Sequence, residues 1–477
     1  MNRSIRHVGW AVVVLFLALA GNLVYLQVIK ADELANDPRN IRTLIRDFSG
    51  PRGDILTSDG EVVARSVEVD DEFEFQRLYP LGGLMSHIGG YFSFSRGSTG
   101  VEAAYNDELT GRDFDLQVRN LEDFVLGKEN TGNVVLSVSA GAQRAAADAL
   151  AGRRGSVVVL DPNNGEIIAM YSNPTFDPQP LASHDIAAAD AEFRALEADP
   201  AKPDLARAYR EIYPPGSSFK IVTSAAALDE GLATPTEPVF PSISELTLPL
   251  TNTTLSNFGN GVCGGNLTES FVQSCNTTFG QLGLELGEQF PPDMERFGIY
   301  DAPPLDLRPG AATSTGPEPG SFAQNQPLFA FAGIGQGEVA TTPLQMALAA
   351  AAVANGGRIA EPHVGREIRD DDGAVISRIR PGDWMTAMPA QTAAEIAAMM
   401  TEVVQRGTGT AAALPDVTVA GKTGTAENSQ GPVDHAWFVG FAPAEAPRYA
   451  IAVIVENSGS GGVVAAPVAA QVLGVLL

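Results

Sequence analysis

Ser217 and Lys220 are residues whose types and spacing could do chemistry. They lie in the stretch YPPGSSFK (213–220), just before the apolar run IVTSAAAL. If this segment starts a helix, Ser217 occupies the first turn and Lys220 follows on the same face. A lysine whose pKa is lowered by burial or by a second cation can take the proton of a serine hydroxyl. The same residues are also compatible with a serine N-cap and a surface lysine.

Two further short stretches form a pattern with this serine and lysine. SCN spans Ser274 to Asn276, and KTGT spans Lys422 to Thr425. Each is weak alone, since the first is also typical of a polar loop and the second of a glycine-bearing strand. In the order S-x-x-K, S-x-N and K-T-G they match the signature of penicillin-interacting serine enzymes.

Other catalytic chemistries lack their motifs. The five histidines, at positions 7, 87, 184, 363 and 435, show no H-x-x-x-H spacing, and C-x-x-C is absent. We therefore expect no catalytic metal and no cofactor. GSSFK is not G-x-S-x-G, and GIGQG and GTGTA lack the spacing of nucleotide-binding loops.

Composition limits the class of partner. The chain has 477 residues, of which 44% are hydrophobic, so two or more domains with folded cores are expected. Lys and Arg total 31 against 57 Asp and Glu, giving a formal charge of -26. Such an excess of negative charge repels phosphate backbones, which argues against nucleic acid as a partner.

The first thirty residues predict a membrane anchor. An apolar stretch from Val8 to Leu26 follows Arg3 and Arg6 and is long enough to span a bilayer. A cleaved signal peptide is the alternative, because ALA at 18–20 resembles a cleavage site. The apolar LVYLQVI beyond that point favours an uncleaved, single-pass span. We expect residues 1–7 in the cytoplasm, residues 8–28 in the cell membrane and the remainder outside.

Turn and strand patterns place a domain boundary near residue 132. Residues 29–131 are charged and broken by turns such as SGPRGDI, which favours a strand-rich module. Residues 132–477 mix helix and strand patterns, including a hairpin predicted for GSVVVLDPNNGEIIAMYS. Near the C-terminus, runs at 417–426, 435–443 and 448–456 predict an antiparallel meander, with a last helix packed on it.

The two cysteines are expected outside the cytoplasm. Cys263 and Cys275 lie twelve positions apart in a Gly- and Asn-rich region. An oxidising compartment permits them to pair, and two unrelated free thiols are the alternative.

The motifs and their flanking blocks resemble the class B penicillin-binding proteins and are most similar to the penicillin-binding protein A group of actinobacteria. YPPGSSFK, SCNT, GIGQGEVATTPLQMA and AGKTGTAE…HAWFVGFAP resemble blocks of the transpeptidase domain. GPRGDILTSDGEVVARS and RLYPLGGLMSHIGGYFSFSRG resemble the non-catalytic N-terminal module. The resemblance implies an α+β fold: a β-lactamase-like transpeptidase domain at 132–477, with an antiparallel sheet flanked by helices, after a pedestal or dimerisation-type module at 29–131.

The resemblance also implies roles for the motif residues. Ser217 attacks the carbonyl between the last two D-alanines of a peptidoglycan stem peptide, and Lys220 is its base. Ser274 relays a proton to the leaving amine, Lys422 keeps the site positive, and Asn276 binds the substrate amide.

The strand motif would bind the end of the substrate. Backbone N–H groups of Ser217 and Thr425 form the oxyanion hole, and the hydroxyls of Thr423 and Thr425 bind the terminal carboxylate. Gly424 leaves room for the substrate chain along the strand. A carboxylate-ended substrate needs a cation, which Lys422 supplies in an otherwise acidic protein.

The partners implied by the resemblance are stem peptides as D-Ala-D-Ala donor and amine acceptor, β-lactams, and a SEDS-type glycosyltransferase contacted through anchor and pedestal. A role in elongation or in division stays open. A D,D-carboxypeptidase with the same residues is one alternative function. A non-catalytic membrane-anchored β-lactam sensor or scaffold is another, although residues 1–7 leave no room for a cytoplasmic signalling domain.

Overall fold

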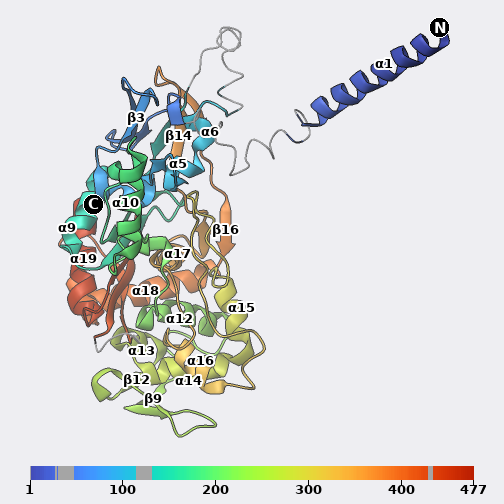
Figure 1. Ribbon diagram of the computed structural model, residues 1–477. Helices are drawn as coiled ribbons and strands as arrows, with labels where there is room; N and C mark the ends of the chain where they lie inside the picture. The colour runs from blue at the N-terminus through green and yellow to red at the C-terminus, as the bar shows by residue number, and fades with distance from the viewer. Residues whose placement is uncertain (1, 27–29, 31–47, 114–115, 117–130, 428–432) are drawn as a thin grey trace.

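The computed structural model describes residues 2–26, 30, 48–113, 116, 131–427 and 433–477 (Figure 1). Near the N-terminus, α1 (Asn2–Val24) contains a stretch from Arg6 to Val24 with a mean hydropathy of 2.0. None of that stretch is buried against the rest of the protein, and its 19 residues suit a membrane span. The expected end of the span at residue 28 lies outside the described residues, as do parts of the predicted strand-rich module.

A five-stranded antiparallel sheet forms the centre of the larger part of the molecule. Its strands lie in the order β17 (Ala420–Ala426), β18 (His435–Ala442), β19 (Tyr449–Val455), β7 (Gly155–Leu160) and β8 (Ile167–Asn173). The predicted C-terminal meander and the predicted hairpin are therefore confirmed. β17 is an edge strand, so alternate N–H and C=O groups face away from the sheet.

Helices bury both faces of this sheet. On β19, Ile451 and Val453 belong to one hydrophobic cluster, shared with α9 (Ala140–Leu150) and α19 (Gly461–Leu476). Their neighbours Ala452 and Ile454 belong to the other cluster, which includes α12 (Lys220–Asp229) and α17 (Pro343–Ala354). Because successive side chains of a strand point to opposite faces, a nearly continuous apolar strand is buried on both sides. The last helix packs on the meander as predicted.

The remaining elements of the larger part lie around this core and at its distal end. Its other helices are α10 (Ile186–Ala198), α11 (Arg207–Arg210), α13 (Leu267–Gln273), α14 (Asn276–Leu286), α15 (Phe290–Glu295), α16 (Gln326–Ala332) and α18 (Ala390–Arg406). Its small sheets pair β9 (Phe240–Ile243) with β12 (Cys263–Gly265), β10 (Glu245–Thr247) with β11 (Thr254–Ser256), and β13 (Arg358–Ala360) with β16 (Asp383–Thr386). β9 and β12 lie at the end of the molecule opposite β3 and β14 (Figure 1).

A six-stranded sheet forms the centre of the smaller part. Its order is β15 (Val375–Arg378), β14 (Gly365–Arg369), β6 (Asn133–Leu136), β1 (Ile55–Leu56), β2 (Val62–Glu68) and β3 (Phe75–Leu78). The short elements α4 (Ser86–Gly89), β4 (Phe92–Ser93), β5 (Gly97–Ser98), α5 (Gly100–Ala104) and α6 (Asn106–Leu109) follow β3 in the chain. Strands from both sides of the predicted boundary at 132 thus share one sheet, since the segment 365–378 returns to it.

Buried charges hold this smaller part together. Glu102 is fully buried and receives Arg52 Nε and Arg77 Nε, each at 2.6 Å. Asp59 joins the two parts by accepting hydrogen bonds from Ala140 N and Gly141 N, the first turn of α9. These orphan N–H groups of a helix start are thereby satisfied from another domain.

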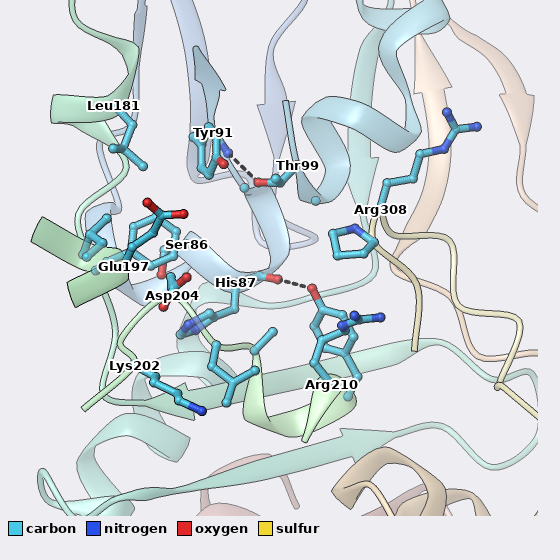
Figure 2. A pocket seen from close by; sticks show the side chains of 18 of the residues that line it. Ser86, His87, Tyr91, Thr99, Leu181, Glu197, Lys202, Asp204, Arg210 and Arg308 are labelled. Carbon is cyan, nitrogen blue, oxygen red and sulfur yellow. Dashed lines mark hydrogen bonds between the residues drawn. The ribbon is translucent and has the colours of Figure 1, made fainter. Parts of the chain in front are cut away.

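A cavity of about 560 Å³ lies where the two parts meet, between α4, α10 and α11 (Figure 2). The polar groups in its inner wall bond within the protein. His87 Nε2 lies 2.8 Å from Pro203 O, Tyr209 OH donates to His87 O at 2.9 Å, and Tyr91 N donates to Thr99 Oγ1. The cavity therefore presents inner polar atoms that already have partners, and its other charged groups lie on the exposed rim.

Candidate active site

The segment before Ser217 is fixed to the central sheet by side chains of that sheet. Trp437 Nε1, from β18, donates to Pro214 O at 3.0 Å. Tyr213 OH donates to Glu456 Oε1 at 2.8 Å, one residue beyond β19. The two prolines of YPPG remove backbone donors and stiffen the chain. The segment is thus held at both ends against strands of a buried sheet.

Gly216 allows this segment to approach β17. It has φ of +53°, and a Cβ added there would lie 2.5 Å from Thr425 O. Ser217 follows within the 3-10 turn at Gly216–Phe219, and Lys220 begins α12 directly afterwards. The predicted helix start, with the serine in its first turn, is found. The half-buried Ser217 hydroxyl makes no hydrogen bond to any part of the chain that the structure describes.

Lys220 is fully buried, and its amine lies against Ser274 and Asn276. Its Nζ lies 2.8 Å from Ser274 O, 2.9 Å from Asn276 Oδ1 and 3.3 Å from Ser274 Oγ. Burial lowers the pKa of Lys220 well below its usual value, and the charge of Lys422 lowers that pKa further. A neutral amine has two N–H donors, and the two carbonyl oxygens accept both. Its lone pair is then available to accept a proton.

Ser274 stands between the two lysines. It ends α13 with φ of +62°, a left-handed conformation that few serines adopt. In this position its Oγ accepts a hydrogen bond from Lys422 Nζ at 2.9 Å and lies 3.3 Å from Lys220 Nζ. Such strain in a native structure persists where the surroundings over-determine it, often at functional sites. The arrangement places one hydroxyl within hydrogen-bond distance of both amines.

Asn276 is held by both ends of its amide. Its Oδ1 accepts from Lys220, and its Nδ2 donates to Ser256 O at 2.9 Å. Its other Nδ2 hydrogen has no acceptor among the residues that the structure describes. The residue begins α14, so its position follows from where that helix starts.

Lys422 is the second buried cation. Its Nζ donates to Ser274 Oγ and, at 3.0 Å, to Thr423 O. Burial lowers the pKa of Lys422 to about 7. Within the described residues, neither Lys422 nor Lys220 forms an ion pair with a carboxylate. The site therefore holds two buried amines that have no carboxylate partner among the described residues. Buried groups with perturbed pKa values of this kind cluster at functional sites.

The other residues of the β17 motif line the edge of the sheet. Thr423 Oγ1 shares a hydrogen bond of 2.5 Å with Thr408 Oγ1, and Thr425 Oγ1 lies 3.5 Å from Gly461 N. A Cβ on Gly424 would meet Pro215 O at 2.7 Å and Ser218 N at 3.1 Å. The structure thus gives a different reason for this glycine than the predicted space for a substrate chain. Gly424 is required because the turn that carries Ser217 lies directly against it.

The geometry can be compared with known families. A family model described as "Penicillin binding protein transpeptidase domain" matches residues 155–474. The chain belongs to the penicillin-binding proteins. A second family model, "Penicillin binding protein A dimerisation domain", matches residues 52–135 of this penicillin-binding protein.

Relatives of this penicillin-binding protein match it over nearly its whole length. It is 39% identical to "Peptidoglycan D,D-transpeptidase PbpA" of Mycolicibacterium smegmatis over 98% of this chain and 97% of that protein. A protein of the same name from Mycobacterium tuberculosis is also 39% identical, over 99% of this chain and 98% of that protein. The fold is similar to M. tuberculosis penicillin-binding protein A in its imipenem acyl-enzyme complex, with a TM-score of 0.82, 37% identity, and coverage of 91% and 99%. The fold is also similar to that of Pseudomonas aeruginosa PBP2, with a TM-score of 0.74 and 31% identity, over 90% of this chain and 95% of that chain.

The structure of this penicillin-binding protein brings the three predicted motifs together at one place. Sequence reasoning missed the residues that support them: Thr408, Ser256, Asn257, Trp437 and Glu456. Trp437 offered a signal, since an indole N–H on a buried strand needs an acceptor. Ser256 and Asn257 offered none, because their contacts to the start of α14 depend on how a distal loop folds back.

Cys263 and Cys275 form a disulfide, with Cα atoms 5.8 Å apart. Cys275 is fully buried between Ser274 and Asn276, whereas Cys263 belongs to β12. The disulfide thus ties a peripheral strand to the start of α14. The described residues contain no group of three or more His, Cys, Asp or Glu that could hold a metal ion.

Proposed function

We propose that this chain is a peptidoglycan D,D-transpeptidase that cross-links stem peptides through an acyl-enzyme on Ser217 and is acylated there by β-lactams. The observation that carries this proposal is the continuous contact from Lys220 through Ser274 to Lys422, with Ser217 in the turn that leads directly into Lys220 and α12. The names of the M. smegmatis and M. tuberculosis relatives support the same activity.

The acylation step follows from these positions. Neutral Lys220 takes the proton of Ser217 Oγ as the oxygen attacks the carbonyl of the D-Ala-D-Ala bond. The N–H groups of Ser217 and Thr425 bind the oxyanion, and each such donor typically supplies about 3 kcal/mol. Ser274 then gives its proton to the nitrogen of the leaving D-alanine and recovers one from Lys220. The peptide bond breaks, an ester forms and the proton balance closes.

Substrate recognition uses the edge of β17. The hydroxyls of Thr423 and Thr425 donate hydrogen bonds to the terminal carboxylate, beside the positive charge of Lys422. Asn276 donates its remaining amide hydrogen to the peptide carbonyl. Because the pKa of Lys422 is lowered to about 7, bound carboxylate would raise it and keep the amine protonated during the reaction.

The second half of the reaction needs an amine from a neighbouring stem peptide. We infer a single-pass arrangement with the N-terminus in the cytoplasm and the catalytic domain outside, where acceptor strands lie. The apolar stretch that begins at Val8 follows Arg3 and Arg6 in the sequence, which supports this orientation. We also infer a SEDS-type glycosyltransferase partner that contacts the anchor and the pedestal, as the resemblance to class B proteins implies.

The nucleophile is tested by labelling with a fluorescent penicillin. Full-length protein in detergent should label in the wild type and lose labelling in Ser217→Ala, because no ester can form. Ser218→Ala is the matched control, since Ser218 Oγ donates to Pro215 O at 2.7 Å and its loss leaves the nucleophile in place. Persistent labelling of Ser217→Ala would contradict the assignment.

Transpeptidation is separated from hydrolysis by the products. Incubation of the full-length protein with a pentapeptide donor and an amine acceptor should yield a cross-linked product and free D-alanine. Tetrapeptide and D-alanine alone would instead support a D,D-carboxypeptidase.

A further inference from the structure

Asn257 is the buried member of an otherwise exposed loop. It is 6% exposed, whereas the next residue, Phe258, is 74% exposed. The loop follows β11 at the distal end of the molecule, well outside the three sequence motifs. A polar side chain is buried in such a place only where its hydrogen bonds are made.

All the bonding capacity of the Asn257 amide is used. Its Nδ2 donates to Ile243 O at 2.8 Å and to Gly261 O at 3.1 Å, which closes the loop on itself. Its Oδ1 accepts from Thr277 N at 3.0 Å and lies 3.3 Å from Thr277 Oγ1. A buried amide with both hydrogens and both lone pairs engaged has one orientation.

The bond to Thr277 replaces a missing helix cap. Thr277 is the second residue of α14, where an N–H group has no partner within the helix. The N-cap residue is Cys275, whose sulfur is bonded to Cys263 and makes no capping hydrogen bond. Asn257 therefore caps α14 from another segment of the chain, and asparagine is among the strongest capping residues.

The neighbour of Asn257 sets the orientation of Asn276. Ser256 O accepts from Asn276 Nδ2, so the oxygen of that amide must face Lys220. If the amide turned over, an N–H would point at the lone pair of Lys220. That contact would compete with the transfer of the serine proton. The orientation of Asn276 thus depends on a carbonyl that the Asn257 side chain holds in place.

We propose that Asn257 is a positioning residue for acylation: it locks the loop 256–261 onto the start of α14 and thereby aims the amide oxygen of Asn276 at Lys220. The inference rests on the proposed function, since it concerns the same base. The Cys263–Cys275 disulfide covalently ties β12, which begins two residues after this loop, to the same helix start. Loss of the asparagine therefore frees the side-chain contacts without releasing the loop from the protein.

The test is a double-mutant cycle on the rate of acylation by a fluorescent penicillin, measured with the full-length protein below its melting temperature. Asn257→Ala should slow acylation about 10- to 100-fold, the order of loss expected from misplacing a catalytic group by about 1 Å. In an Asn276→Ala background, the same substitution should change the rate by less than about threefold, because the amide through which it acts is gone.

A matched control is available at Asn173. It also donates its amide to two backbone carbonyls, Gly152 O at 2.9 Å and Arg153 O at 3.0 Å, at the far end of β8. Asn173→Ala should leave acylation unchanged. If Asn257→Ala melts below the assay temperature, Asn257→Asp takes its place in the cycle, since it keeps the acceptor for Thr277 and loses both donors to the loop.

Two outcomes would overturn the inference: wild-type acylation in the Asn257 variant, or the same fold-loss in the presence and absence of Asn276. Either could occur while Ser217→Ala still abolishes labelling, so the inference can fail without the proposed function. Labelling of Ser217→Ala by the fluorescent penicillin would instead contradict the proposed function itself.

Discussion

Among the buried cations of the described residues, two pairs have opposite surroundings. In the pedestal, Arg52 and Arg77 share the carboxylate of Glu102. Burial raises the pKa of Glu102, but the charges of Arg77 and Arg52 outweigh burial and the net shift is downward. In the catalytic part, the hydrogen bonds of the Lys220 and Lys422 amines among the described residues go only to hydroxyl and carbonyl oxygens. The two amines also lie over the rings of Phe279 and Phe271.

The difference separates a stabilising cluster from a reactive one. A carboxylate between two guanidinium groups keeps all three charges in place, and arginine does not give up its proton. Two lysines without a carboxylate have lowered pKa values, and a lysine can lose its proton near neutral pH. Burial without a carboxylate partner therefore lowers both lysine pKa values, and in the mechanism that we propose it makes Lys220 available as a base, at a cost in stability.

The largest expected effect comes from removing the base. Lys220→Met should lower the rate of acylation by about 10²- to 10⁴-fold, the usual contribution of general base catalysis. Lys220→Arg should lose as much, because a guanidinium keeps the charge and cannot accept the proton. Stopped-flow measurement with a fluorescent penicillin checks both variants. Wild-type rates in Lys220→Arg would mean that charge alone matters.

The next largest effect is expected from breaking the buried cluster of Arg52, Arg77 and Glu102 in the pedestal. Glu102→Gln leaves two buried arginines without a counter-charge and should lower the free energy of unfolding by about 3–5 kcal/mol. Acylation by folded protein should stay within twofold of the wild type. Denaturant unfolding measures the loss.

The control for Glu102→Gln is Glu61→Gln, which breaks an exposed pair with Arg144 and should lower the free energy of unfolding far less than Glu102→Gln does. Equal losses in the two variants would contradict the role given to burial.

The smallest effect concerns pH and the lysine on β17. The folded-state pKa of Lys422 is lowered to about 7, so between that pH and its ordinary value of 10.5 the unfolded chain binds more protons. Stability should therefore rise with pH in this window, by about 2 kcal/mol between pH 7 and pH 9.

Lys422→Met should lack this part of the rise, as measured by urea unfolding at both pH values. Lys202→Met is the control, because Lys202 is exposed and lies outside the site. The same pH dependence in wild type and Lys422→Met would show that the lysine titrates normally when folded.

Local patterns in the sequence predicted the elements that carry the motifs. β18 and β19 lie within one residue of their predicted limits, because each is a long apolar run with clear breaks. The order of the three motifs predicted which side chains would meet. The contacts of Ser274 with both lysines agree with that prediction.

Contacts between distant segments could not be predicted in this way. Nothing in the residues 365–378 indicates that they pair with β6 rather than with the central sheet. Likewise, the Ser256 and Asn257 contacts depend on a loop closing over a helix start twenty residues later. The packing of the Ser217 turn against Gly424 could not be predicted either, since local sequence does not say which backbone will approach a strand. That Gly424 also leaves room for the substrate chain stays a prediction.

The return of 365–378 to the pedestal sheet constrains the order of folding during synthesis. β1, β2 and β3 leave the ribosome early, yet β6 receives its second neighbour, β14, only after most of the catalytic part has been made. Until then one edge of β6 has unpaired backbone N–H and C=O groups, which other strands can pair with. The six-stranded sheet of the smaller part therefore stays incomplete until β14, which is encoded more than two hundred residues after β6, has been made. Truncating the chain after β8 would leave this edge of β6 permanently unpaired.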